Sequence, residues 1–212
     1  MQYDPLASIF VARLHGDLVI LDLADDTYSC IIAADRSLDA SDQLDSTLLG
    51  PLGLCADTAA HVLAPQSAST RRPRDLTRCP TAQLSCADAT RFIASLVETS
   101  WHFRRRALRH LLAVARRQER PRSVLPPDEL ARQVAAFERA CLWLPVKIEC
   151  LFRSLHLLLF LRRSGQGVDW VFGVHLFPFR AHCWLMVGDE VIGDAVHRTT
   201  AFTPIMTTGP ST

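Results

Sequence analysis

Runs of apolar residues mark the start of the chain as β structure. Residues 8–14 alternate imperfectly between apolar and polar, and residues 18–23 form a nearly continuous apolar run, with Gly16-Asp17 as a turn signal between them. Asp25-Asp26 provides a second turn before Thr27 to Ile32, a segment rich in strand-forming residues. The pattern predicts a three-stranded antiparallel meander.

The stretch after the meander has shorter and weaker patterns. Residues 41–49 start with a serine that can cap a helix, and residues 57–63 have the apolar content of a second short helix. A few strands with short helices indicate a winged-helix-like module over residues 1–65. Residues 66–84 are rich in proline, serine and arginine, which is typical of a linker.

Helical spacing dominates the middle of the chain. A capping box at Ser85 starts a helix that we expect to run, with a break, to Arg117. A second helix begins at Pro126-Pro127 and ends before Pro145, and a third begins near Glu149 and stops around Ser164-Gly165.

Residues beyond Gly167 return to β patterns. We expect strands over 168–176, 182–187 and 190–192, with Gly188-Asp189 as the tight turn between the last two. The fold class is therefore α+β, with helices followed by an antiparallel sheet in a second domain over residues 85–212.

Composition narrows the class of protein. With 49% hydrophobic and 21% charged residues, the chain is globular rather than disordered. No long uncharged apolar run and no secretory signal is found, so we expect a cytoplasmic protein without stable membrane insertion. Its seven cysteines contain no CxxC pair, so we expect reduced thiols and no metal site.

Charge is divided unevenly along the chain. Residues 1–65 carry a net charge of −8 and the remainder +9, which supports two domains. Eight arginines gather between residues 104 and 122, and such a cluster can bind nucleic acid. No aromatic or glycine-rich recognition motif accompanies them, so we expect no nucleic-acid partner and instead a solvated or protein-docking face. No phosphate-binding loop is present, and we expect no cofactor.

Cys150 is the strongest candidate nucleophile. It lies in the first turn of a predicted helix, where unpaired N–H groups and the helix dipole favour the thiolate. Free cysteines are more often packing residues, so position alone does not decide its role. His182 and Asp194 follow on two strands joined by the 188–189 turn, in the order that a nucleophile, base and orienting acid require. His175 and His197 are weaker candidates for the base.

Several short strings resemble one family when they are taken together. They are residues 149–155 (ECLFRSL), Gly173-Val174, Pro178-Phe179, Ala181-His182-Cys183-Trp184 and Ile192-Gly193-Asp194. Residues 86–200 thus resemble the transglutaminase-like domain of lasso-peptide maturation B proteins. The strand over residues 17–23 and Tyr28 resemble the leader-recognition module found in front of such domains.

The resemblance implies a cysteine peptidase that removes the leader of a lasso-peptide precursor. Cys150 would be the nucleophile, His182 the general base and acid, and Asp194 the orienting group, with the Cys150 N–H as an oxyanion donor. An extended leader would add to the edge strand, whose residues are Thr27, Tyr28, Ser29, Cys30, Ile31 and Ile32. The core peptide would pass to an asparagine-synthetase-like cyclase, which uses the ATP.

Two departures from the family pattern and two other functions remain open. Cys183 stands where relatives show Ala or Ser, and Gly193 where Asn is common. Trp184 would shield the imidazole or simply face the core, and Arg153 would pair with a carboxylate or be solvated. The same three groups also suit an acyltransferase, and the acidic front module alone would suit a non-catalytic adaptor.

Overall fold

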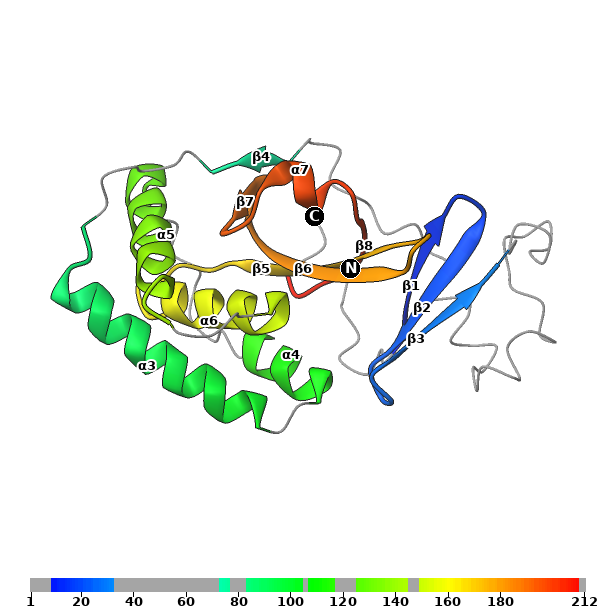
Figure 1. The fold of residues 1–212 in the computed structure, drawn as a ribbon, viewed down its shortest axis with the longest axis horizontal. Helices are drawn as coiled ribbons and strands as arrows, with labels where there is room; N and C mark the ends of the chain where they lie inside the picture. The colour runs from blue at the N-terminus through cyan, green and yellow to red at the C-terminus, as the bar shows by residue number, and fades with distance from the viewer. Residues whose placement is uncertain are drawn as a thin grey trace.

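The computed structural model describes residues 9–32, 73–76, 83–104, 107–116, 125–144 and 149–209. Figure 1 shows a three-stranded sheet at one end of the molecule, a second sheet at its centre, and helices against the other side of that central sheet. The predicted α+β class, with an N-terminal antiparallel sheet and helices followed by a sheet, is confirmed.

The N-terminal sheet has the order β1-β2-β3, all antiparallel. β1 spans Ile9–Leu14, β2 Asp17–Asp22 and β3 Thr27–Ile31, so the predicted meander is confirmed. Its turns use backbone of positive φ at His15, Gly16 and Asp26. The helices predicted over 41–49 and 57–63 lie outside the described residues.

The part of the chain that the structure describes has four longer helices, of which α6 packs on the central sheet and the other three pack on α6. They are α3 (Cys86–Phe103), α4 (Leu108–Arg116), α5 (Pro127–Cys141) and α6 (Cys150–Arg162). The predicted capping box starts α3, because Ser85 Oγ accepts from the Asp88 N–H at 3.1 Å and Asp88 accepts from the Ser85 N–H. α6 is buried from Ser154 to Leu161, which explains why its sequence is apolar on every side.

The central sheet has the order β4-β7-β6-β5-β8. Its strands are β4 (Arg74–Asp75), β5 (Asp169–His175), β6 (Arg180–Val187), β7 (Glu190–Ile192) and β8 (Thr203–Thr207), with helix α7 (Val196–Thr199) before β8. β5, β6 and β7 match the predicted strands. β4 falls inside the segment predicted as a linker and pairs in parallel with β7, and neither β8 nor α7 was predicted.

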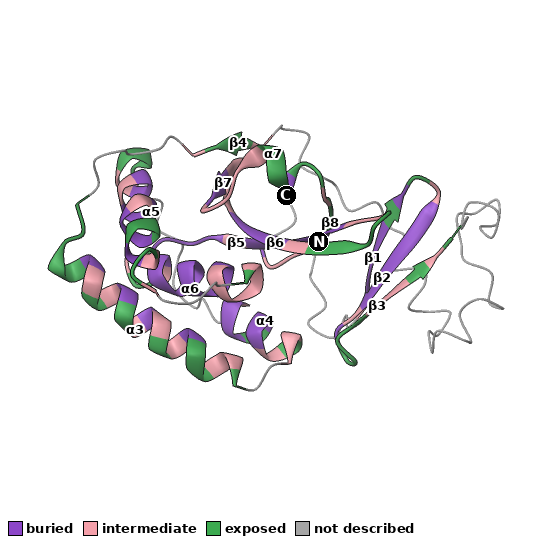
Figure 2. Ribbon diagram, in the orientation of Figure 1, coloured by how far each residue is buried: buried purple, intermediate pink, exposed green. Residues whose placement is uncertain are grey.

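One continuous core joins the two sheets and the helices (Figure 2). The face of the N-terminal sheet that carries Phe10, Ala12, Val19 and Leu21 packs into the same cluster as α6 and β5. The N-terminal sheet is therefore held against the rest of the protein by buried apolar surface. Among the described residues, no helix combines the length and apolar character needed to cross a membrane.

Candidate active site

Cys150 is the first residue of α6, as predicted. The preceding Glu149 has extended backbone and makes no side-chain cap, so the N–H groups of the first turn are not occupied by a capping side chain. The positive end of the helix dipole therefore faces the Cys150 sulfur. Because the next turns of α6 are buried against the sheet, this end of the helix is rigidly placed.

His182 lies on β6, and Asp194 follows the end of β7 by two residues. β6 and β7 meet at a turn in which Gly188 has φ 57°, and their paired residues include Leu185 with Ile192. Beyond that pair, Gly193 has φ 68° and lies so close to Leu157 that a side chain there would collide with it. This bend directs Asp194 back toward β6, where its Oδ2 lies 2.6 Å from His182 Nε2.

The carboxylate and the imidazole are both shielded from solvent, with side chains 11% and 14% exposed. Asp194 Oδ1 accepts a hydrogen bond from the Ala195 N–H at 2.8 Å and lies 3.4 Å from Arg198 Nη1. Burial acts to raise the pKa of Asp194, but the hydrogen bonds from His182 and the Ala195 N–H, with the Arg198 charge, lower it below its usual value. Asp194 is therefore a carboxylate.

The imidazole contacts both other groups. The hydrogen bond to Asp194 and then that to Cys150 raise the pKa of His182 to about 9. Since Nε2 faces Asp194, Nδ1 is the ring nitrogen that faces the thiol. His182 is thus protonated at neutral pH and links the carboxylate to the sulfur.

The sulfur of Cys150 is surrounded by donors. A hydrogen bond from the Cys183 thiol, one from His182 and one from the Cys183 backbone lower the pKa of Cys150 to about 4, against the opposing effect of burial. Cys150 is therefore a thiolate paired with an imidazolium, the form in which a cysteine is a nucleophile.

These groups line a small cavity of about 120 Å³ between α6 and the β6–β7 strands. Cys150, Ser154 and Leu157 lie along one face of α6 and form one wall. His182 and Asp194 form the opposite wall, and the guanidinium-bearing residues Arg153 and Arg198 also line it.

Aromatic rings hold the imidazole in place. Trp184 stacks on His182 with ring centroids 6.1 Å apart and an interplanar angle of 27°, and Phe202 lies 5.2 Å away. A side chain at Gly173, on the neighbouring strand, would meet the Trp184 ring at 2.8 Å. Trp184 is 5% exposed and also packs on Val171 and Val191, so it both faces the core and covers the imidazole.

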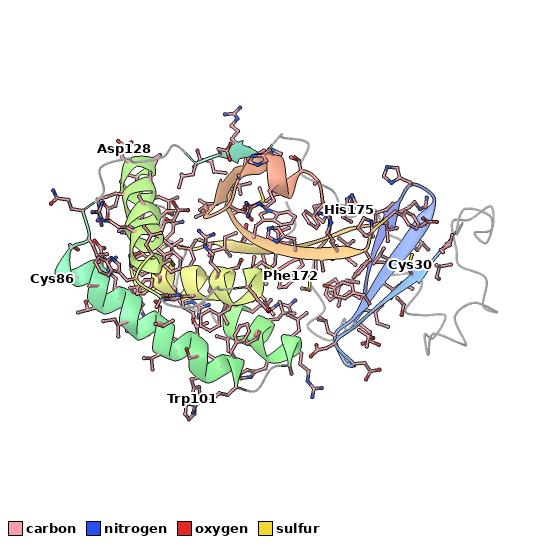
Figure 3. The ribbon with its side chains drawn as sticks, viewed as in Figure 1. Cys30, Cys86, Trp101, Asp128, Phe172 and His175 are labelled. Carbon is pink, nitrogen blue, oxygen red and sulfur yellow. The ribbon has the colours of Figure 1, made fainter. Side chains whose placement is uncertain are left out.

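A residue of the N-terminal sheet reaches this region. Tyr28 of β3 packs its ring on Phe179 at 5.3 Å, three residues before His182. Burial, and to a smaller extent the negative charge of the nearby Cys150 thiolate, raise the pKa of Tyr28 to about 12. Figure 3 shows the side chains and labels His175 at the end of β5 and Cys30 on β3. This proximity of Tyr28 to Cys150 was not predicted.

The other histidines near the site, and Arg153, make contacts that do not involve the Cys150 sulfur. His175 Nδ1 lies 3.2 Å from the Pro178 carbonyl oxygen and His197 is an exposed residue of α7, so neither contacts Cys150 in a described hydrogen bond. Buried His156 lies among phenylalanine rings, and burial lowers its pKa to about 4. Arg153 pairs with Glu138 of α5 at 3.3 Å, the carboxylate pairing that was predicted.

Three residues of the site had no predicted role in it: Arg198, Phe202 and Cys183. Arg198 lies on the unpredicted helix α7, Phe202 lies in the turn between α7 and β8, and no motif marks either residue. Cys183 was noticed only as a departure from a family pattern. Within the described residues, no group of three or more histidine, cysteine or acidic side chains is arranged to hold a metal ion.

Comparison with known proteins identifies the part of the chain that carries this site. A model of the transglutaminase-like superfamily matches residues 93–207, which is more than half of the chain and includes Cys150, His182 and Asp194. No curated protein and no solved structure matches the chain significantly. The helix-then-sheet arrangement and the family match agree, and the chain belongs to the transglutaminase-like superfamily.

Proposed function

We propose that this protein is a cysteine peptidase that binds a lasso-peptide precursor in the cytoplasm and removes its leader. The observation that carries the proposal is the continuous set of contacts from Asp194 through His182 to the Cys150 sulfur. Members of the transglutaminase-like superfamily are typically cysteine proteases or transglutaminases, which form thioesters at such a cysteine.

The reaction follows from the charge states of the three groups. The Cys150 thiolate attacks the carbonyl carbon of the scissile bond, and the Cys150 N–H donates to the oxyanion. His182 gives the proton on Nδ1 to the leaving amine of the core peptide, which leaves the leader as a thioester on Cys150. His182 then takes a proton from water, which attacks the thioester and releases the leader carboxylate. Asp194 keeps the imidazole oriented throughout.

Recognition of the leader is assigned to β3. Among the described residues, this strand is at the edge of the N-terminal sheet, because β2 is the one strand that pairs with it. Tyr28, Cys30 and Ile32 alternate onto one face, where Tyr28 is packed at Phe179 while Cys30 and Ile32 are exposed. If the leader adds antiparallel to β3, its C-terminal end lies beside Tyr28, which is at the end of β3 nearest Cys150.

The released core peptide would pass to an asparagine-synthetase-like cyclase that uses ATP. The arginine-rich segment 104–122 is the proposed docking face for that partner, and of its arginines Arg104, Arg109 and Arg116 lie within the described residues. A protein surface with excess positive charge attracts acidic partner surfaces over about 10 Å at ordinary salt.

Incubation with a full-length precursor peptide tests the proposal. Wild-type protein should release leader with a free carboxylate, and Cys150→Ala should release none, while Cys141→Ala serves as a matched cysteine control. An intact mass of the leader product that shows an added amine in place of water would assign the chain to the acyltransferases. Cleavage by Cys150→Ala at the wild-type rate would contradict the proposal. If the wild-type protein binds the precursor but does not cleave it, the protein is a non-catalytic adaptor.

A further inference from the structure

Two thiols lie in contact within the cavity, and the proposed reaction uses only one of them. Cys150 and Cys183 both line this cavity, on α6 and on β6 respectively. The Cys183 thiol hydrogen-bonds with the Cys150 sulfur. Among the described residues, Cys183 is the only other cysteine on the cavity wall, since Cys30 and Cys86 are exposed elsewhere and Cys141 lies on α5.

Cys183 is held at this position by its surroundings. It is 3% exposed, and its Sγ lies 3.8 Å from Ser154 Oγ, one helical turn beyond Cys150. Ser154 Oγ in turn donates to the Cys183 carbonyl oxygen at 3.1 Å, which fixes β6 against α6. Within the described residues, the buried indole N–H of Trp170 has no other hydrogen-bond partner, and it contacts the same sulfur.

We propose that Cys150 and Cys183 are a peroxide-modifiable pair, in which Cys150 is oxidised first and Cys183 resolves it to a reversible intramolecular disulfide. The proposal needs the Cys150 thiolate that the proposed function also needs, but it needs no peptide substrate. Both sulfurs line one small cavity and are joined by a hydrogen bond. A disulfide has an S–S length of about 2.05 Å, so its formation requires the two side chains to rotate toward each other.

The chemistry balances with hydrogen peroxide as the oxidant. The Cys150 thiolate attacks one peroxide oxygen, the O–O bond breaks, and uptake of one proton gives a sulfenic acid and one water. The Cys183 sulfur then attacks the Cys150 sulfur, forms the S–S bond and expels hydroxide, which is protonated to a second water. The two thiols lose two electrons and two protons in total, and the peroxide is reduced to two waters.

The electrostatics favour this order of events. While Cys150 is a thiolate, its hydrogen bond and then burial raise the pKa of Cys183 well above the usual value, so Cys183 stays protonated. Conversion of Cys150 to an uncharged sulfenic acid removes the thiolate whose hydrogen bond is the largest cause of the raised Cys183 pKa. The contact from the Trp170 indole N–H, which lowers the pKa of Cys183, remains and stabilises its thiolate. Cys183 therefore becomes reactive only after Cys150 has been oxidised.

Thiol mapping of the full chain tests the proposal without any substrate. After brief treatment with dilute peroxide, the wild-type mass should fall by two hydrogens, and digestion should give a peptide pair that links Cys150 to Cys183. Dithiothreitol should then return nearly all of Cys150 to the free thiol. Cys141→Ala, altered outside the cavity, should give the same linked pair.

Cys183→Ser should give no linked pair. With dimedone present, its Cys150 should instead be trapped as the adduct of the sulfenic acid. Without dimedone, the same Cys150 should gain two and then three oxygen atoms, which dithiothreitol does not remove. The proposal is overturned if wild-type protein accumulates Cys150 sulfinic acid at the same rate as Cys183→Ser. It is also overturned if Cys150 forms a disulfide with a cysteine other than Cys183. If the linked pair forms but the precursor is not cleaved, the thiol pair stands and the peptidase assignment fails.

Discussion

The charge states of Cys150 and His182 set a pH range for thiol reactivity. The pKa of Cys150 is lowered to about 4 and that of His182 is raised to about 9, so the thiolate–imidazolium pair exists between those limits. Iodoacetamide should alkylate Cys150 rapidly and almost uniformly from about pH 5 to 8. Peptide cleavage should decline above about pH 9, because neutral His182 no longer protonates the leaving amine.

Peptide mass mapping at each pH measures the alkylation rate at Cys150 itself. The urea-unfolded chain provides the control, since its thiols titrate near the ordinary value of about 8.5. Folded-state alkylation that rises only near that value would mean that Cys150 is an ordinary thiol and would remove the electrostatic basis of the site.

The role proposed for the Asp194 carboxylate is to orient the imidazole. Asp194→Asn should keep the shape of the site but lose the negative charge that fixes the protonation and orientation of His182, so kcat should fall by about 10³-fold or more. Arg198 only lies 3.4 Å from the same carboxylate and is 59% exposed, so Arg198→Ala should cost less than about fivefold. Steady-state kinetics on the precursor separate the two, and equal losses would refute the orienting role.

At the scale of elements, the start of α3 is stabilised by a buried carboxylate and two arginines that pair with it. The Asp88 side chain is 0% exposed, caps the helix through Ser85, and pairs with Arg91 and Arg132 at 2.9 Å each. Asp88→Ala should destabilise the protein by about 2–4 kcal/mol, because it removes a cap and leaves two arginines without their buried partner. Urea unfolding measures the loss.

Asp128→Ala is the matched control for that change. Asp128 also lies in the first turn of a helix, α5, but it is exposed and makes no side-chain cap. It should lower the unfolding free energy by less than about 0.5 kcal/mol. Similar losses for the two variants would show that the contacts of Asp88 contribute little.

The elements that could be predicted are those with a strong local signal. The capping box marks α3, and the Gly188-Asp189 turn marks the β6–β7 hairpin that aligns His182 with Asp194. β4 has two residues and is a strand only because it pairs with β7, more than 110 residues later. β8 contains Pro204, which is tolerated at the sheet edge, and its register shifts opposite Gly173. Neither segment carries a local pattern.

At the scale of the whole molecule, the two sheets share one core, and this relation cannot be derived from local sequence. The order of Cys150, His182 and Asp194 along the chain indicated a candidate site. The position of Tyr28 at Phe179 depends instead on how the N-terminal sheet docks on β6. Docking of this kind is determined by buried side chains of both parts together, so no single motif reports it.

The exposed end of β3 provides a test of leader binding. Ile32 is 69% exposed, so Ile32→Asp should leave the unfolding free energy nearly unchanged while weakening binding of a fluorescent leader peptide by about tenfold or more. Val97→Asp alters a similarly exposed residue of α3, 64% exposed, and should not change binding. Fluorescence anisotropy measures both, and equal leader affinity for Ile32→Asp and wild type would place the leader elsewhere.

Cleavage by the proposed route requires a covalent bond between Cys150 and the leader, and intact mass spectrometry of acid-quenched reactions measures this bond directly. We expect a transient species heavier than the protein by the leader acyl group, with the added mass on the peptide that contains Cys150. Leader release without such a species in rapid-quench experiments, or the same species in Cys150→Ala, would contradict it.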